Sequence, residues 1–282
     1  MVLFKMDIVI NAEIAERPEN GMPISCQGNY YHHILACLGD SNDVPPVADV
    51  LRRYHDLDGQ WLIVSPVHWQ ATHNDAMIVA TGHELQLSEE ESRLWFTALS
   101  EFMAFDHIHL HYHDAYTWLL QSDGKPPITA RTLHALRHQS MMPEIQTLDS
   151  TLFWPRLITE TQMLFSSHPL NKSRTEKYQI NGVWIWGSTL KHTVRSKPLV
   201  CHDGRLIKLA KLLSTDVKAY PSLASLSKNS VLLCSEINED EHALLQTRFQ
   251  NETVHWYWNN MAYQSKPKSL WSRLRGRFEL LC

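Results

Sequence analysis

The feature that most constrains the fold is a change of hydrophobic period between residues 61 and 122. Apolar runs at residues 61–64 and 76–80 predict two strands, separated by a polar loop. Ser88 then opens a helix with glutamates in its first turn, and apolar residues recur at helical spacing as far as Met103. The period returns to two between residues 107 and 120. We therefore predict a ββαββ unit.

The regions on either side of this unit predict further α and β structure. A helix is expected over residues 152–168, ending before Pro169. Strand, helix and strand patterns then alternate between residues 199 and 234, which favours parallel pairing. The prediction is an α/β fold with α+β features: a mixed sheet with flanking helices plus a ββαββ subdomain. The predicted domains are an N-terminal α/β segment (1–60), the ββαββ subdomain (61–122), and a C-terminal α/β region (123–282) that packs with 1–60.

Composition excludes several classes of protein. With 44% hydrophobic and 20% charged residues, the chain is expected to fold rather than remain disordered. A formal net charge of −4 gives no overall attraction to nucleic acid. The tail from Lys266, with basic residues between 268 and 277, predicts a solvated element or one that covers an acidic surface of the same protein. No apolar run approaches the roughly 18 to 20 residues of a membrane-spanning helix. Five scattered cysteines without a C-x-x-C pair indicate free thiols, so we expect a cytoplasmic protein without a membrane partner.

Four histidines alternate along the predicted strand after the helix: His107, His109, His111 and His113. Alternate residues of a strand share one face, and imidazoles two positions apart can bind one metal ion. This arrangement is compatible with a divalent metal cofactor and with a metal-dependent phosphotransferase or hydrolase. The alternative is that the histidines form the solvated side of an edge strand whose other side faces the core. The sequence identifies no third ligand and no groups that would orient the ligands, although Asp106 or Asp114 could act with the histidines in such an enzyme.

A second group of candidate residues lies between residues 168 and 187, here called the tryptophan segment. A helix end, two amides, an arginine and a glycine-terminated strand are expected to converge on an anion. The candidate ligand-binding residues are His168, Asn171, Arg174, Asn181, Trp184, Trp186 and Gly187. The alternative is structural, because a glycine at a strand end usually turns the chain and the two tryptophans would then belong to the core.

The tryptophan segment also carries a family resemblance. The run His168-Pro169-Leu170-Asn171, then Arg174, then residues 181–187 (Asn-Gly-Val-Trp-Ile-Trp-Gly) resembles archaeal-type cofactor-independent phosphoglycerate mutases. These read His-Pro-Val-Asn, then Arg, then Asn-x-Ile-Trp-Leu-Trp-Gly. Upstream, residues 66–69 and the ββαββ pattern resemble uncharacterised proteobacterial proteins that share this block. The likeness covers about residues 61–213.

The chain lacks the sequence motifs that carry out the chemistry of that family. The resemblance implies the alkaline-phosphatase superfamily, whose members use an N-terminal acidic-glycine metal motif, a serine nucleophile and a later Asp-His pair to hold two divalent metals. This N-terminus has no Asp-Gly motif, and no Asp-His pair follows Asp203. Without a nucleophile and metals the transferred charge is not stabilised, so mutase activity is not expected.

Three functions therefore remain open. The resemblance favours a catalytically degenerate mutase-like protein that binds a small phosphorylated metabolite or a protein partner. The histidine strand favours a metal-dependent enzyme. A structural or interaction protein would instead expose an aromatic patch, for which residues 256–258 (Trp-Tyr-Trp) are the candidates.

Overall fold

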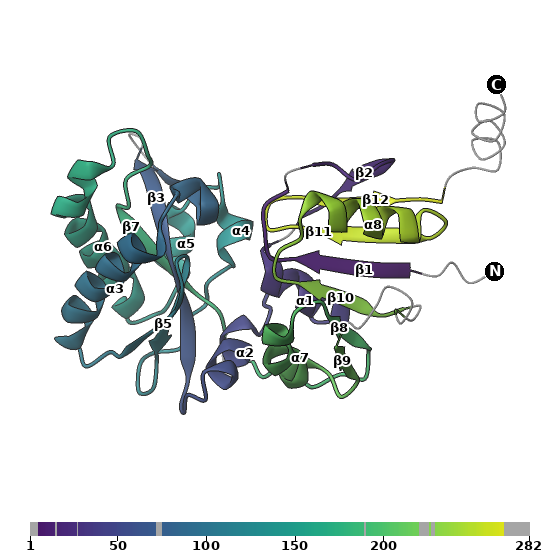
Figure 1. Cartoon of the computed structure of the whole chain (residues 1–282). Coiled ribbons are helices and arrows are strands. Elements are labelled where there is room, and N and C mark those ends of the chain that lie inside the picture. Colours follow the sequence, from purple (N-terminus) through teal and green to yellow (C-terminus); the bar gives the residue numbers. More distant parts are fainter. Residues whose placement is uncertain are drawn as a thin grey trace, which may run out of the picture. The chain divides into compact units, whose positions relative to one another are not determined.

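The computed structural model describes residues 5–14, 16–26, 28–71, 75–188, 190–219, 226 and 229–267 (Figure 1). The basic stretch at residues 268–277 therefore lies outside the described residues. The chain forms two compact units: unit 1 comprises Met1–Gly39 and Thr193–Cys282, and unit 2 comprises Asp40–His192. The divisions thus fall at Gly39/Asp40 and His192/Thr193, whereas the sequence pattern placed them at 60/61 and 122/123. The N-terminal residues up to Gly39 share a unit with the C-terminal region.

Unit 1 is built on a seven-stranded mixed sheet. In sheet order its strands are β2 (Gly21–Ile24), β12 (Ala262–Ser265), β11 (Thr253–Tyr257), β1 (Lys5–Ile10), β10 (Val231–Cys234), β8 (Leu199–Cys201) and β9 (Val217–Ala219). The five strands from β11 to β9 run parallel, while β12 and β2 form an antiparallel edge. The alternation of strands and helices after residue 199 predicts this parallel pairing.

Helices cover both faces of the unit 1 sheet. They are α1 (Tyr30–Leu38), α7 (Ile207–Leu213) and α8 (Glu239–Phe249), with the short 3₁₀ turn η3 (Gly204–Leu206). One face of β1 presents Met6, Ile8 and Ile10 to a core that contains Leu245 and Phe249 of α8. The opposite face carries Asp7, whose carboxylate binds Lys197 Nζ at 2.9 Å. The same ammonium group donates to the Cys37 carbonyl of α1, so α1 lies on this second face.

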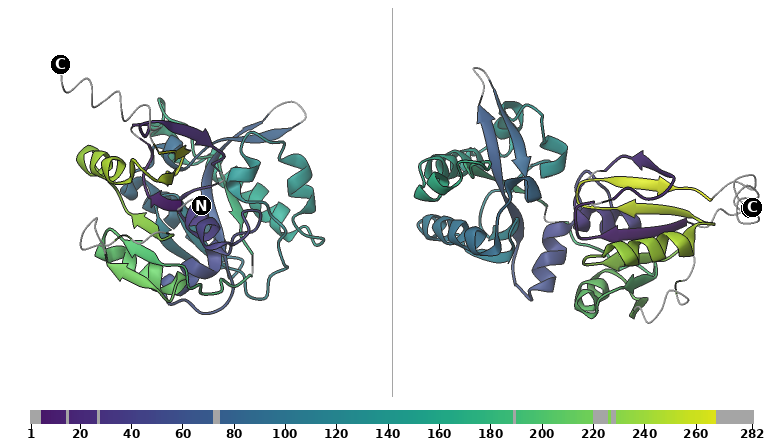
Figure 2. Two further views of the ribbon diagram at one scale, coloured as in Figure 1. Left: turned by 90° about the vertical axis from the view of Figure 1, so that its right-hand side faces the viewer. Right: turned by 45° about the horizontal axis from the view of Figure 1, so that its top comes forward.

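Unit 2 is built on an antiparallel sheet of five strands. They are β3 (Trp61–Ala71), β4 (Ala76–Thr81), β5 (Leu110–Asp114), β6 (Thr117–Gln121) and β7 (Gly182–Trp186). The long strand β3 pairs with β4, β6 and β7, and β5 lies at an edge beside β6. Figure 2 shows β3 and β4 as an extended hairpin. The elements of the predicted ββαββ unit are therefore present, and the predicted mixed α/β fold is confirmed.

The helices of unit 2 are α2 (Val47–Tyr54), α3 (Glu89–Ala104), α4 (Leu133–Leu136), α5 (Met142–Thr147) and α6 (Phe153–Ser166), with 3₁₀ turns η1 (Gly82–Leu85) and η2 (Pro169–Ser173). Helices α3 and α6 pack together through Trp95 and Phe165, whose ring centroids are 4.7 Å apart. Within the described part of the chain, no helix combines the length and the hydropathy that a bilayer-spanning segment needs.

The histidine strand begins later than its alternating pattern predicts. His107 N–H donates to the Ala104 carbonyl at the end of α3, and His107 adopts a left-handed φ of 54°. The chain therefore closes the helix before it enters β5 at Leu110. Only His111 and His113 lie within the strand.

Candidate functional site

The carboxyl ends of the parallel strands of unit 1 meet at one edge of its sheet. Ligands of open parallel sheets bind at such edges. Here the residues that follow β1, β8, β10 and β11 are mostly polar, and several bond one another across the edge. Asn259 Nδ2 donates to Asn11 Oδ1 at 3.2 Å, and Ser235 Oγ donates to Asp203 Oδ2 at 3.3 Å. We refer to this region as the carboxyl edge.

The N-terminus of α1 lies at the carboxyl edge. The Tyr30 N–H in its first turn donates to Asn259 Oδ1 at 2.9 Å. Asn29, the N-cap residue, does not cap the helix with its side chain; its Oδ1 accepts from His32 Nδ1 at 2.8 Å instead. The first turn contains no acidic residue. The partial positive charge of the helix end is therefore not balanced by a carboxylate within the turn.

The hydroxyl of Tyr30 is a buried polar group at the same edge. Tyr30 is 2% exposed, and its hydroxyl has no hydrogen-bond partner among the described residues. Burial raises the pKa of Tyr30 well above its usual range, and the thiols of Cys234 and Cys201, at the ends of β10 and β8, contribute to this rise. A buried hydroxyl without a partner costs about 1 to 3 kcal/mol, which favours a water molecule or ligand group beside it.

Cys26 and His33, a residue of α1, form a neutral pair. Cys26 Sγ lies 3.4 Å from His33 Nε2, and the His33 ring stacks on Tyr257. Burial raises the pKa of the Cys26 thiol and lowers the pKa of His33 to about 4. At neutral pH the pair is thus a thiol and an uncharged imidazole. A catalytic cysteine needs a stabilised thiolate, so this pair is a poor nucleophile.

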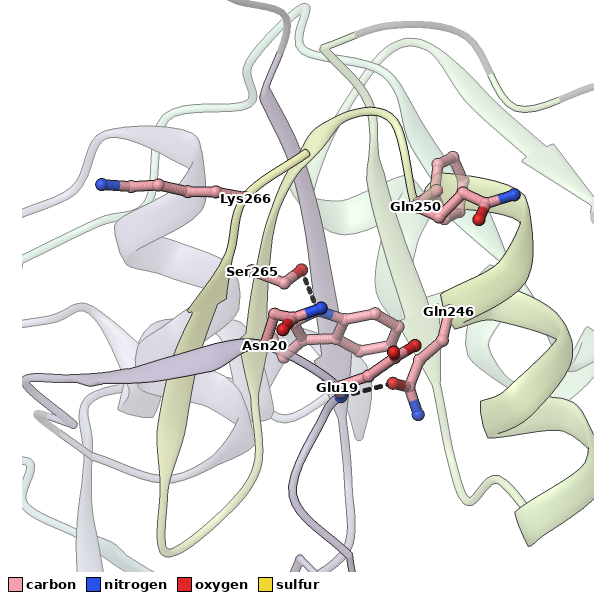
Figure 3. A pocket seen from close by; sticks show the side chains of 8 residues that line it. Glu19, Asn20, Gln246, Gln250, Ser265 and Lys266 are labelled. Carbon is pink, nitrogen blue, oxygen red and sulfur yellow. Dashed lines mark hydrogen bonds between the residues drawn. The ribbon is translucent and has the colours of Figure 1, made fainter. Parts of the chain in front are cut away.

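A shallow pocket elsewhere in unit 1 opens beside Trp256 (Figure 3). Its ≈ 330 Å³ of empty space includes open solvent, and Trp256 beneath it is buried. The lining groups already bond one another: Trp256 Nε1 donates to Ser265 Oγ at 3.0 Å, and the Glu19 N–H donates to Gln246 Oε1 at 2.5 Å. The Lys266 side chain extends away from the pocket (Figure 3). We assign no function to this pocket.

Within the tryptophan segment of unit 2, both asparagines form hydrogen bonds with the main chain. Asn171 is buried and donates to the carbonyls of Phe165 and Ile180, both at 2.9 Å, while its Oδ1 accepts from the Ile180 N–H. Asn181 makes a two-point contact with the backbone of Trp69 in β3, at 2.7 and 2.8 Å. These amides join α6, η2 and β7 to β3.

Arg174 is buried and bonded to three other residues of unit 2. Its guanidinium pairs with Glu91 at the start of α3 and donates to the carbonyls of Leu85 and, at 2.8 Å, Tyr178. Only 2% of Arg174 is exposed. All three nitrogens of the side chain are therefore engaged within unit 2.

The remaining candidate residues of the segment also contact their own chain. Trp184 Nε1 donates to the Arg131 carbonyl and Trp186 Nε1 to Ser65 Oγ, and both indoles are buried. His168 Nδ1 accepts from the Leu170 N–H, with its ring 4.9 Å from that of Trp95. The segment holds α3, α6, β3 and β7 together, and anion binding by these residues stays a prediction.

Gly187 is expected to be required for the turn that ends β7. Its φ of +110° strains any residue with a Cβ, and an added Cβ would lie 3.4 Å from the Cβ of Ala48. Gly187→Ala should therefore lower the free energy of unfolding by about 1 to 2 kcal/mol, measured by urea denaturation. At Gly204, where an added Cβ meets nothing within 4 Å, alanine should change stability by less than about 0.5 kcal/mol. An equal effect at the two positions would contradict this prediction.

The structure separates the four candidate histidines into two pairs. His107 and His109 are exposed before β5, whereas His111 and His113 are half-buried in it. The latter two meet His55, which directly follows α2: His55 Nε2 lies 2.8 Å from His113 Nδ1, and the ring centroids of His55 and His111 are 4.4 Å apart. No pattern in the sequence links His55 to the strand, so sequence reasoning missed it. Among the described residues, no three metal-ligating side chains already converge on one point.

The aromatic residues after Thr253 do not form the exposed patch that an interaction protein would need. Trp256 and Trp258 are buried, and they stack at 6.0 Å in the core that packs against α8. Their alternation in β11 and just beyond it places both on the same inner face.

Comparisons with known proteins found similarity among solved structures alone. No protein-family model matches the chain, and no relative was found among curated proteins. Among solved structures, the cofactor-independent phosphoglycerate mutase from Thermoplasma acidophilum DSM 1728 is similar over 94% of this chain and 90% of that chain. The two share 13% sequence identity with a TM-score of 0.37, a similarity too slight to assign a role to any residue.

Proposed function

We propose that this chain is a mutase-like protein without mutase activity, which binds a phosphorylated metabolite at the carboxyl edge of unit 1. The observation that carries the proposal is the N-terminus of α1, which lies at the ends of parallel strands. Its N-cap residue Asn29 makes no capping bond and its first turn has no acid, although the Tyr30 N–H is bonded to Asn259 Oδ1. Helix N-termini of this kind bind phosphate groups through their N–H groups and dipole.

The surroundings of this helix end suit an anion. The side-chain amides of Asn11 and Asn259 lie beside the helix end, and the Tyr30 hydroxyl is a buried donor at the same edge. The nearby carboxylate of Asp203 is compensated, because its hydrogen bonds with Arg205 lower its pKa to about 2. These groups support a ligand with one phosphate and a polar remainder.

Among its described residues, this edge has no acidic-glycine metal motif after β1. Strand β1 is followed by Asn11 and Ala12, where the family resemblance implies an acidic metal motif. The Cys26 thiol is protonated beside a neutral His33 and so does not replace the missing nucleophile. The proposal is therefore binding, without turnover.

Calorimetric titration with 3-phosphoglycerate tests the proposal. Asn29→Asp keeps a good N-cap residue but places a negative charge at the helix end, so it should weaken binding at least tenfold, about 1.4 kcal/mol. The matched control is Asn238→Asp, the same change at the N-cap of α8, which should bind like the wild type.

Two results would overturn this assignment. If the wild-type protein gives only the heats of dilution, 3-phosphoglycerate does not bind. Binding that survives Asn29→Asp but is lost in a folded Arg174→Met variant would place the anion in the tryptophan segment instead.

A further inference from the structure

Three imidazoles from two elements of unit 2 come together in one cluster. His55 lies at the end of α2, and His111 and His113 belong to the edge strand β5. The ring centroids of His55 lie 4.4 Å from His111 and 5.0 Å from His113. The pairing of β5 with β6 is irregular between Tyr112 and Asp114, which locally changes the direction of His113. We call these residues the three-histidine cluster.

The geometry points to a binding site for a transition metal ion at this cluster, of the Zn²⁺, Ni²⁺ or Cu²⁺ type. His55 Nε2 and His113 Nδ1 already face each other at 2.8 Å. Two nitrogens on a tetrahedral zinc ion, with bonds of about 2.0 to 2.1 Å, lie roughly 3.3 Å apart. A small opening of the pair would therefore admit the ion, and a rotation of His111 would supply a third nitrogen.

The carboxylate of Asp114 lies near the second ring nitrogen of His113. His113 Nε2, the ring nitrogen that does not face His55, lies 3.6 Å from Asp114 Oδ2. Metal-bound histidines usually donate their second N–H to a carboxylate, which fixes the tautomer and orients the ring. In the metal-bound form His113 would carry its proton on Nε2 toward Asp114, and the lone pair on Nδ1 would face the ion.

The chemistry of the ligand atoms limits which metal ions suit the cluster. The ligands that converge are nitrogens rather than oxygens, which disfavours magnesium and calcium. Nickel, copper and zinc all suit imidazole ligands.

Calorimetry of the full chain with zinc chloride alone, in buffer without phosphate or chelator, tests the inference. Wild type should bind one equivalent, and His55→Gln and His113→Gln should each weaken binding about 100-fold. Asp114→Asn keeps the hydrogen bond to the Tyr116 N–H but loses the charge, and should weaken binding about 10-fold. The matched controls are His107→Gln and His109→Gln, which change exposed histidines of the same run and should leave the titration unchanged.

Several outcomes would overturn the inference. They are the absence of zinc binding by wild type, binding undiminished in His55→Gln, and an equal loss in His109→Gln. If circular dichroism shows that a ligand variant does not fold, Asp114→Asn decides alone: unchanged affinity in that variant refutes the site.

Discussion

Replacing Arg174 by methionine is expected to lower the free energy of unfolding of unit 2 by about 3 to 5 kcal/mol. The variant keeps an unbranched chain of similar width at the buried position, but it is shorter than arginine and removes every hydrogen bond that Arg174 donates. Glu91 then loses its cationic partner, and the carbonyls of Leu85 and Tyr178 lose their donor. Each buried acceptor left unpaired costs about 1 to 3 kcal/mol. The change is measured by urea denaturation of the full chain.

Arg156→Met is the matched control for this prediction. Arg156 is an exposed residue of α6 whose ion pairs with Asp106 and Glu160 span 3.8 and 3.4 Å. Such surface pairs contribute about 0 to 1 kcal/mol, so the control should unfold close to wild type. An Arg174→Met variant as stable as the control would show that the guanidinium does not hold unit 2 together. Arg174 would then again be a candidate anion ligand.

The sequence predicts those parts of the fold that depend on local periodicity. The helix after Ser88 is observed as α3, and the Ser88 hydroxyl accepts from the Glu91 N–H at 3.1 Å as its spacing predicts. The helix expected over residues 152–168 is observed as α6, Phe153–Ser166. These signals lie within a few residues of the structures they specify, so neighbouring side chains suffice to read them.

The candidate sites depend on contacts between residues that are distant in the chain, and periodicity does not report these. The guanidinium of Arg174 bonds residues on α3 and η1, more than 80 positions earlier. His55 meets His113 across 58 positions. A forked donor and a histidine run therefore look the same in the sequence whether their partners come from a ligand or from another part of the fold.

The second large effect concerns pH. We expect unit 1 to lose about 3 kcal/mol of its free energy of unfolding as the pH falls from about 6.5 to about 4. Burial lowers the pKa of His33 from its ordinary 6.5 to about 4, so below pH 6.5 the unfolded chain takes up a proton that the folded chain does not. The stabilisation is complete above the unfolded pKa and is lost through this window, with little further loss from His33 below pH 4.

His33→Phe separates this effect from other titrations. Phenylalanine keeps an apolar ring that can stack on Tyr257, although it loses the contact between His33 Nε2 and Cys26 Sγ. We expect the variant to be less sensitive to acid than wild type, by about 3 kcal/mol in the difference between unfolding free energies at pH 7.5 and pH 4. His107→Phe, the same change at an exposed position of unit 2, should leave the acid sensitivity of unit 1 in place. Identical pH profiles for wild type and His33→Phe would mean that His33 binds its proton equally well in the folded and unfolded chains. The assignment of a neutral thiol and a neutral imidazole would then be wrong. The argument that Cys26 is a poor nucleophile would no longer hold.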